Sequence, residues 1–131
     1  MKLALPCTKN DIAQFKKRND LFIKFGGLVD HSALIVYAPS VRNEAISECE
    51  RLSTIFDGKI EAAQMAQEPD FNNKMANQNY TFYSVAMHMA RVGNKEPWLL
   101  LEADAYPTDY GWANPLQNAQ KASGQIGRAH V

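Results

Sequence analysis

The chain has 131 residues, a length that suits one domain and leaves little room for a second. Hydrophobic residues make up 46% of it and charged residues 21%, close to ordinary globular usage. The 14 basic residues balance the 14 acidic ones. This argues against a dedicated DNA-coating protein, because there is no global positive field, but not against a local basic patch.

Targeting and redox signals are weak in this chain. Cys7 and Cys49 lie far apart and have no metal-binding spacing, so we expect a reduced, cytoplasmic protein. The apolar stretch before Pro6 is too short for a signal peptide, and Pro6 interrupts it. No stretch approaches the roughly 20 apolar residues of a membrane span.

The first elements are a strand and a helix. Lys2–Pro6 is apolar and predicts a short strand. Thr8 or Asn10 is suited to cap the helix that follows. Gly26-Gly27 ends that helix, as glycines do just beyond a helix C-terminus. Its apolar face is imperfect and consists of Ile12, Phe15, Leu21, Phe22 and Phe25.

The next segments repeat this alternation. Ser32–Ala38 is almost wholly apolar, which is typical of a strand buried on both faces in a parallel sheet. Val41–Phe56 has apolar residues at helical spacing and ends at Asp57-Gly58. Lys59–Met65 predicts a third, weaker strand.

A polar loop over Gln67–Asn73 precedes a predicted helix over Met75–Val92. Pro97 introduces a fourth buried strand over Trp98–Leu101, and Asp109–Gln120 is expected to be helical. The apolar surface of the third helix is supplied by Tyr80, Phe82, Tyr83, Val85, Met87 and Met89.

The predicted order is therefore strand and helix in alternation, with connections long enough for helices. This pattern predicts an α/β fold, a Rossmann-like three-layer α/β/α sandwich with a mainly parallel sheet. Ligands of such sheets bind beyond the carboxyl ends of the strands.

Two acids stand at that end of the fourth strand, in Glu102-Ala103-Asp104. In an extended chain, residues i and i+2 share a face, so both carboxylates are expected to project to one side. Carboxylate oxygens suit Mg²⁺ or Mn²⁺, which can bridge a diphosphate and neutralise a leaving group. The simpler alternative is a pair of solvated acids that cap the next helix.

The segment Pro97–Pro107, followed by Gly111-Trp112, resembles the DxD region of glycosyltransferases with the GT-A fold. It is most similar to small glycosyltransferase-like proteins of bacteriophages and bacteria. The resemblance implies a nucleotide-diphospho-sugar transferase fold over most of residues 2–120. It also implies that Asp104 binds the divalent ion, while Glu102 contacts the ribose or a metal-bound water. Glu102 departs from the commoner Asp at its position, which leaves its role less defined.

The same resemblance suggests further donor contacts. Pro6, Cys7 and Thr8 correspond to the segment that lines the nucleotide pocket, although an ordinary strand-to-helix turn explains them equally well. Asn77 is the best candidate in an Asn-rich segment that faces the nucleotide, where amides can read a base edge and Lys74 can meet a phosphate. The alternative there is a polar loop and helix start.

Other reactive side chains have simpler interpretations. We expect His31 and His88 to be structural, and no histidine is a convincing metal ligand. Cys7 has no assignable partner histidine, so a buried small hydrophobe is a better interpretation than a nucleophile. No glycine-rich phosphate loop of a standard pattern is present.

The last residues, Ile126–Val131, match one reading frame of a common sequencing-library adapter (ATC GGA AGA GCA CAC GTC). We therefore interpret residues 1–124 as the N-terminal part of a single GT-A-like domain, incomplete at its C-terminus. Residues 125–131 are then a non-native read-through tail, with a genuine polar tail as the alternative. An inverting enzyme needs a general base near the acceptor, which is expected beyond residue 120.

The sequence thus predicts a metal-assisted glycosyltransferase that uses Mn²⁺ or Mg²⁺ and a nucleoside diphosphate sugar. The acceptor and the retaining or inverting outcome stay open. There are two alternatives: a catalytically inactive glycosyltransferase-like binding or phage structural module, and another Mg-dependent α/β nucleotide enzyme. No strong nucleic-acid signature is present.

Overall fold

The computed structural model of the chain describes residues 1–107, 112–113 and 127–129. Within these residues, five strands form one parallel sheet in the order β3-β2-β1-β4-β5. Their bounds are β1 Lys2–Cys7, β2 Ser32–Tyr37, β3 Ile60–Gln64, β4 Trp98–Leu101 and β5 Gly127–Ala129. The prediction of a parallel α/β sheet is confirmed.

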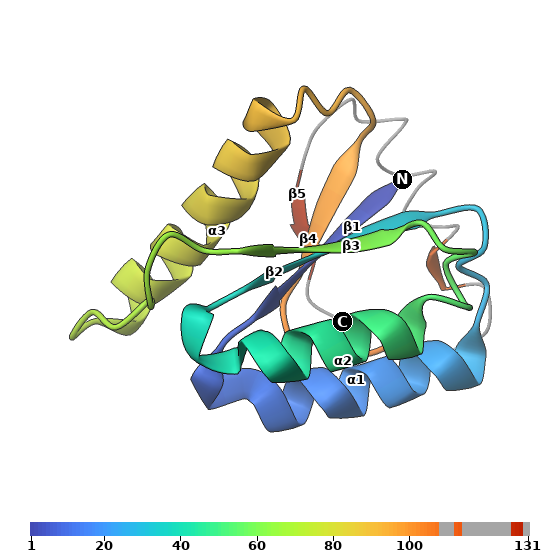
Figure 1. Cartoon of the computed structure of the whole chain (residues 1–131), viewed down its shortest axis with the longest axis horizontal. Coiled ribbons are helices and arrows are strands. Elements are labelled where there is room, and N and C mark those ends of the chain that lie inside the picture. Colours follow the sequence, from blue (N-terminus) through green and yellow to red (C-terminus); the bar gives the residue numbers. More distant parts are fainter. Residues whose placement is uncertain (108–111, 114–126, 130–131) are drawn as a thin grey trace.

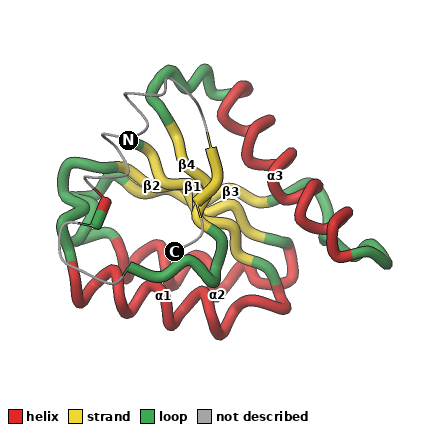
Figure 2. The backbone as a smooth tube through the Cα atoms, turned by 180° about the vertical axis from the view of Figure 1, so that it is seen from behind, coloured by secondary structure: helices red, strands yellow, loops and turns green. Residues whose placement is uncertain are grey.

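In the described part of the chain, three α-helices cover the sheet, and they divide between its two faces. Their bounds are α1 Ile12–Phe25, α2 Arg42–Leu52 and α3 Lys74–Arg91. Figure 1 shows α1 and α2 side by side on one face, while α3 lies on the other; Figure 2 shows the same layers from behind. This division follows from the strand order. Right-handed crossovers place α1 and α2 together on the way to β3, and α3 opposite them on the return to β4.

The neighbouring strands β1 and β2 are buried on both faces of the sheet. Leu3–Cys7 of β1 and Ala33–Tyr37 of β2 are all buried, as expected for inner strands of a covered parallel sheet. Fully buried aromatic rings of α1 and of the segment after α2, including Phe15, Phe22 and Phe56, fill the space below them. β3 is only half-buried, because it is an edge strand.

Two helices differ from the prediction. α2 ends at Leu52 instead of Phe56, and turns lead to Asp57 and Gly58, both with positive φ (53° and 76°). In α3, Val85 and Met89 are buried, but Phe82, Tyr83 and Met87 are exposed, so its predicted apolar surface is only partly covered. Of the predicted helix over Asp109–Gln120, most lies outside the described residues.

Gly127–Ala129, which we set aside as part of a read-through tail, forms β5 beside β4, with Leu99 paired to Gly127. The structure thus gives these three residues a place in the sheet. Their origin in the gene stays a prediction, because a strand position does not reveal which DNA encoded it.

Candidate functional site

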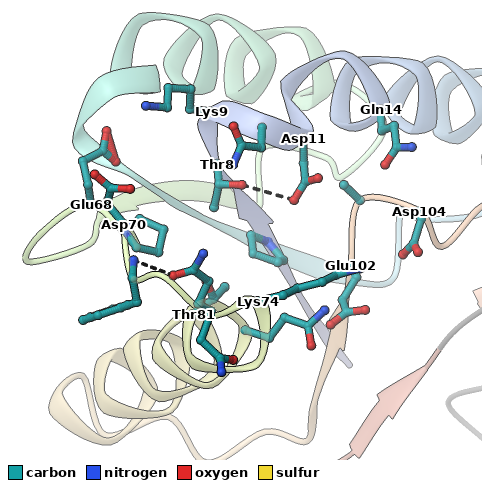
Figure 3. A pocket seen from close by; sticks show the side chains of 18 of the residues that line it. Thr8, Lys9, Asp11, Gln14, Glu68, Asp70, Lys74, Thr81, Glu102 and Asp104 are labelled. Carbon is teal, nitrogen blue, oxygen red and sulfur yellow. Dashed lines mark hydrogen bonds between the residues drawn. The ribbon is translucent and has the colours of Figure 1, made fainter.

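A cleft of about 790 Å³ lies at the carboxyl ends of β1 and β4. Three segments line it: the turn from β1 into α1, the loop and first turns of α3, and the end of β4 (Figure 3). This is the point where the chain's crossovers change direction along the sheet, since β1 leads to β2 on one side and borders β4 on the other. In open α/β sheets such switch points are where ligands bind.

Pro6 explains why the sheet opens there. The Lys2 amide donates to the Pro97 carbonyl over 2.9 Å, so every second residue of β1 directs its backbone groups toward β4. Pro6 stands at such a position and has no N–H to donate. The paired register of β1 and β4 accordingly ends at Ala4 and Leu100, two residues short of Pro6.

The turn from β1 into α1 forms one wall of the cleft. The Thr8 hydroxyl donates to the Asp11 carboxylate over 3.2 Å, and a short 3₁₀ helix, Lys9–Asp11, leads into α1. The helical segment begins after Thr8 as predicted, but the expected cap is wrong: Thr8, the residue before the 3₁₀ helix, makes no side-chain capping bond, and Asp11 instead of Asn10 directly precedes α1. The positive end of this helix faces the cleft, where it favours anionic groups.

The acidic element forms the opposite wall as a turn. The Ala105 amide donates to the Glu102 carbonyl over 2.9 Å, the i to i+3 bond of a β-turn. Our expectation that Glu102 and Asp104 share a face of an extended chain is therefore wrong, because β4 ends at Leu101. Both nevertheless line the cleft, with Glu102 half-buried and Asp104 exposed.

The third wall is built by the loop before α3. The Asn77 side-chain oxygen accepts from the Phe71 amide (2.8 Å), and the Tyr80 hydroxyl accepts from the Gln67 amide (3.1 Å). The Phe71 and Tyr80 rings pack at a tilt, with centroids 5.6 Å apart. These contacts hold the loop against α3 and bring Asn77 and Phe71 to the cleft.

The charge of the cleft is strongly negative although the whole chain is neutral. Among the described residues, five carboxylates line it against the two ammonium groups of Lys9 and Lys74. Figure 3 shows Glu102 and Asp104 at one end and Glu68 and Asp70 at the other. The fifth carboxylate belongs to Asp11. This arrangement attracts cations and repels free anions.

The carboxylates suit a divalent ion that is shared with a ligand. No group of three or more His, Cys, Asp or Glu side chains is gathered for a metal within the described ranges. Glu102 and Asp104 open together onto the cleft, and Mg²⁺ typically takes one or two carboxylates plus phosphate and water oxygens. The donor set therefore fits an ion that arrives with a phosphorylated ligand.

Most of the predicted site residues meet at this cleft. It is lined by Pro6, Thr8, Asn77, Glu102, Ala103 and Asp104. Cys7 is not among the lining residues, because side chains alternate along β1 and that of Cys7 is buried on the face covered by α1. Burial raises the pKa of the Cys7 thiol to about 12, which favours the hydrophobe over the nucleophile.

One residue beside the site was missed in the sequence. Arg18 is fully buried, and its guanidinium donates to the carbonyls of Leu101 and Glu102, both over 3.1 Å. The signal was its spacing: Arg18 lies three residues after Phe15 and four before Phe22, on the buried stripe of α1. The apolar members of the stripe alone do not reveal it.

The chain matches no protein-family model, no curated protein and no solved structure. Among the helices of the described part, none is both long and apolar enough to cross a membrane. The function is therefore argued from the geometry of the cleft.

Proposed function

We propose that the chain binds a nucleoside diphosphate sugar together with Mn²⁺ or Mg²⁺ and acts as a glycosyltransferase. One observation carries the proposal: an acidic turn directly beyond β4 opens onto a cleft at the switch point of a parallel sheet. The GT-A fold, which the sequence resembles around Trp98–Trp112, belongs to this proposal. The strand order and the position of the acidic turn are compatible with it.

The charge of the cleft supports a metal-bound diphosphate. A free diphosphate would face mostly carboxylates, and a divalent ion held by Asp104 would offset that repulsion. Asp104 would hold the ion and Glu102 would support it through a bound water or the ribose. When bound, the ion would neutralise the charge that develops on the diphosphate leaving group.

The other walls offer matching groups for the rest of a nucleotide. Thr8 and Lys9 lie at the start of the first helical segment. Backbone amides and the helix dipole favour phosphate groups near such a helix start. The side-chain oxygen of Asn77 already accepts a hydrogen bond from the Phe71 amide. Its NH₂ group is therefore the part that would donate to a base. The exposed Phe71 ring gives a base a surface to pack on.

The test is binding of UDP-glucose and GDP-mannose with and without Mn²⁺, measured by calorimetry. In Asp104→Asn we expect the Mn²⁺-dependent binding of the preferred donor to weaken at least tenfold, about the effect of losing a metal ligand or its support. Glu50→Gln, an exposed acid on α2 outside the cleft, is the matched control and should bind like the wild type.

Donor binding that is as tight in EDTA as in Mn²⁺, or Mn²⁺-dependent binding that survives Asp104→Asn unchanged, would contradict the proposal. Binding of nucleoside triphosphates in preference to both sugars would favour another Mg-dependent nucleotide enzyme. That second candidate is supported by the same switch-point cleft, which serves many nucleotide-binding α/β proteins. Tight binding without release of the sugar to any acceptor or to water would indicate a binding module.

A further inference from the structure

Arg18 is an unusual residue for the inside of a small domain. Its side chain is fully buried and lies between the rings of Phe15 and Phe22. The central guanidinium carbon is 5.0 Å from the centroid of the Phe15 ring and 4.9 Å from that of the Phe22 ring. Besides the two carbonyls at the end of β4, its partner is the Asn19 side chain at 3.4 Å. Its Nη2 atom has no hydrogen-bond partner within the described residues. A charge held this way is expensive to bury, so a role beyond filling space is expected.

The ladder between β1 and β4 identifies that role. The Lys2 amide donates to the Pro97 carbonyl. A parallel ladder repeats every two residues, so the Ala4 amide faces the Leu99 carbonyl and the backbone nitrogen of residue 6 faces the Leu101 carbonyl. Position 6 is proline and cannot donate. The carbonyl that this leaves without a ladder partner, that of Leu101, is one of the two that Arg18 binds.

The same helix holds the chain again further along. Phe22 stacks on Trp112 with ring centroids 5.2 Å apart and planes 8° from parallel, and the Lys17 ammonium lies 5.9 Å from the centre of the Tyr106 ring. A continuous series of ring and guanidinium contacts, which we call the stack, thus runs from Phe15 through Arg18 and Phe22 to Trp112. The stack begins in α1 and ends beyond the acidic turn, so α1 contacts the segment on both sides of Asp104.

We propose that Arg18 is the positioning residue of the acidic turn: it makes to Leu101 the hydrogen bond that Pro6 cannot make. The strands separate to form the cleft, while the guanidinium keeps the end of β4 and the Glu102 carbonyl in place. Arg18 acts from the α1 face and does not line the cleft. The inference rests on the proposed function only in its consequence for metal binding.

Two measurements test the proposal on the whole chain. Hydrogen exchange over residues 101–107 reports the order of the turn, and titration with Mn²⁺ in the presence of UDP reports the two carboxylates. In Arg18→Lys and Arg18→Met we expect exchange of the turn to accelerate about tenfold or more, as a buried hydrogen bond is lost. Mn²⁺ affinity should fall about 10- to 100-fold, the usual effect of losing an outer-shell partner.

A second substitution separates positioning from core filling. Pro6→Ala restores an N–H that faces Leu101, so in the Arg18→Met background it should return much of the lost protection of the turn. A residue that only fills space would show no such coupling. Should the Arg18 variants fail to fold, Phe22→Leu removes one ring of the stack, keeps an apolar side chain and should shift both readouts in the same direction.

Arg91→Met is the control, because it removes the same guanidinium group from an exposed position in the last turn of α3, on the face of the sheet opposite α1 (Figure 1). It should leave the turn and Mn²⁺ binding unchanged. A folded Arg18 variant with wild-type exchange over 101–107, or failure of Pro6→Ala to restore a turn that Arg18→Met has disturbed, would overturn the assignment. If the wild type binds no Mn²⁺ with UDP present, the proposed metal site fails, and the exchange data alone decide the role of Arg18.

Discussion

Pro6 and Cys7 are neighbours in β1, yet they serve opposite faces of the sheet. Pro6 lines the cleft, while Cys7 is fully buried on the side of α1, near the charges of Arg18, Glu44 and Glu48. Burial is the main cause that raises the pKa of the Cys7 thiol, from an ordinary 9.0 to about 12. At this scale, one step along a strand changes a side chain from the wall of the cleft to the core on the other face of the sheet.

The raised pKa of Cys7 predicts a pH dependence of stability. Between pH 9 and pH 12 the folded state keeps a proton that the unfolded thiol has released, so stability falls as the pH rises. From pH 7 to pH 10 we expect the wild type to lose about 1.4 kcal/mol more free energy of unfolding than Cys7→Ala. Urea unfolding of both proteins at the two pH values measures this difference.

Cys49→Ala is the comparison for that experiment, because the Cys49 thiol is only partly buried. It should retain most of the wild-type loss between pH 7 and pH 10. Equal losses in the wild type and in Cys7→Ala would show that the folded thiol ionises normally.

The sequence located the acids of the site but not the residue that holds them. Glu102 and Asp104 were visible because a fully apolar strand runs straight into them. Their turn geometry was not visible, since it depends on the Ala105 amide. Arg18 was overlooked because charged residues are rarely buried without a partner acid, and here its partners are backbone carbonyls.

At the scale of the elements, a side-chain cap holds the first turn of α3. Asn73 is its N-cap, and the side-chain oxygen accepts from the amides of Met75 (2.8 Å) and Ala76 (3.2 Å). Few of its side chains are buried, so tertiary packing contributes less to this helix than to α1.

We therefore expect Asn73→Ala to lower the free energy of unfolding by about 1 kcal/mol, the usual value of an N-cap. Asn73→Asp should retain most of the stability, because a carboxylate also accepts these bonds and favours the helix N-terminus. Asn72→Ala, an exposed neighbour, is the control and should change little. Thermal unfolding followed by circular dichroism measures all three; equal midpoints for Asn73→Ala and Asn72→Ala would contradict the capping role.

The positions of the helices and strands were largely predictable because hydrophobic periodicity can be read from a short stretch of sequence. The buried run over Ser32–Ala38 and the glycines after Phe25 define β2 and the end of α1 without tertiary information. The end of α2 was not predictable from periodicity, since buried Phe56 continues the apolar pattern although the backbone has left the helix. The exposed face of α3 was missed because periodicity does not show which apolar residues find a neighbour.

At the scale of the whole molecule, the balance of charge conceals a local excess. The chain is neutral, but the folding of three distant segments into one cleft gathers carboxylates at both of its ends. Composition could not show this, because it contains no information about which segments meet. The parallel sheet was predictable from the alternation of elements, whereas the strand order that creates the switch point was not.

This local charge predicts how the far end of the cleft affects binding. Asp70→Asn removes one negative charge at the end opposite Asp104, so we expect UDP to bind about two- to fivefold more tightly without metal at low salt. The gain should shrink at 0.5 M NaCl because salt screens exposed charges. Asp57→Asn, outside the cleft, is the matched control, and calorimetry with UDP and EDTA gives the affinities. Equal affinities for Asp70→Asn and the control would argue against electrostatic exclusion.

The two tryptophans lie in different layers of the molecule. Trp112 stacks on Phe22 of α1, whereas Trp98 packs against Phe82 of α3, with ring centroids 5.8 Å apart. Each indole is therefore an intrinsic fluorophore for one side of the sheet. Single-tryptophan versions of the chain would let an emission spectrum distinguish loosening of the α1 layer from loosening of the α3 layer, without any attached label.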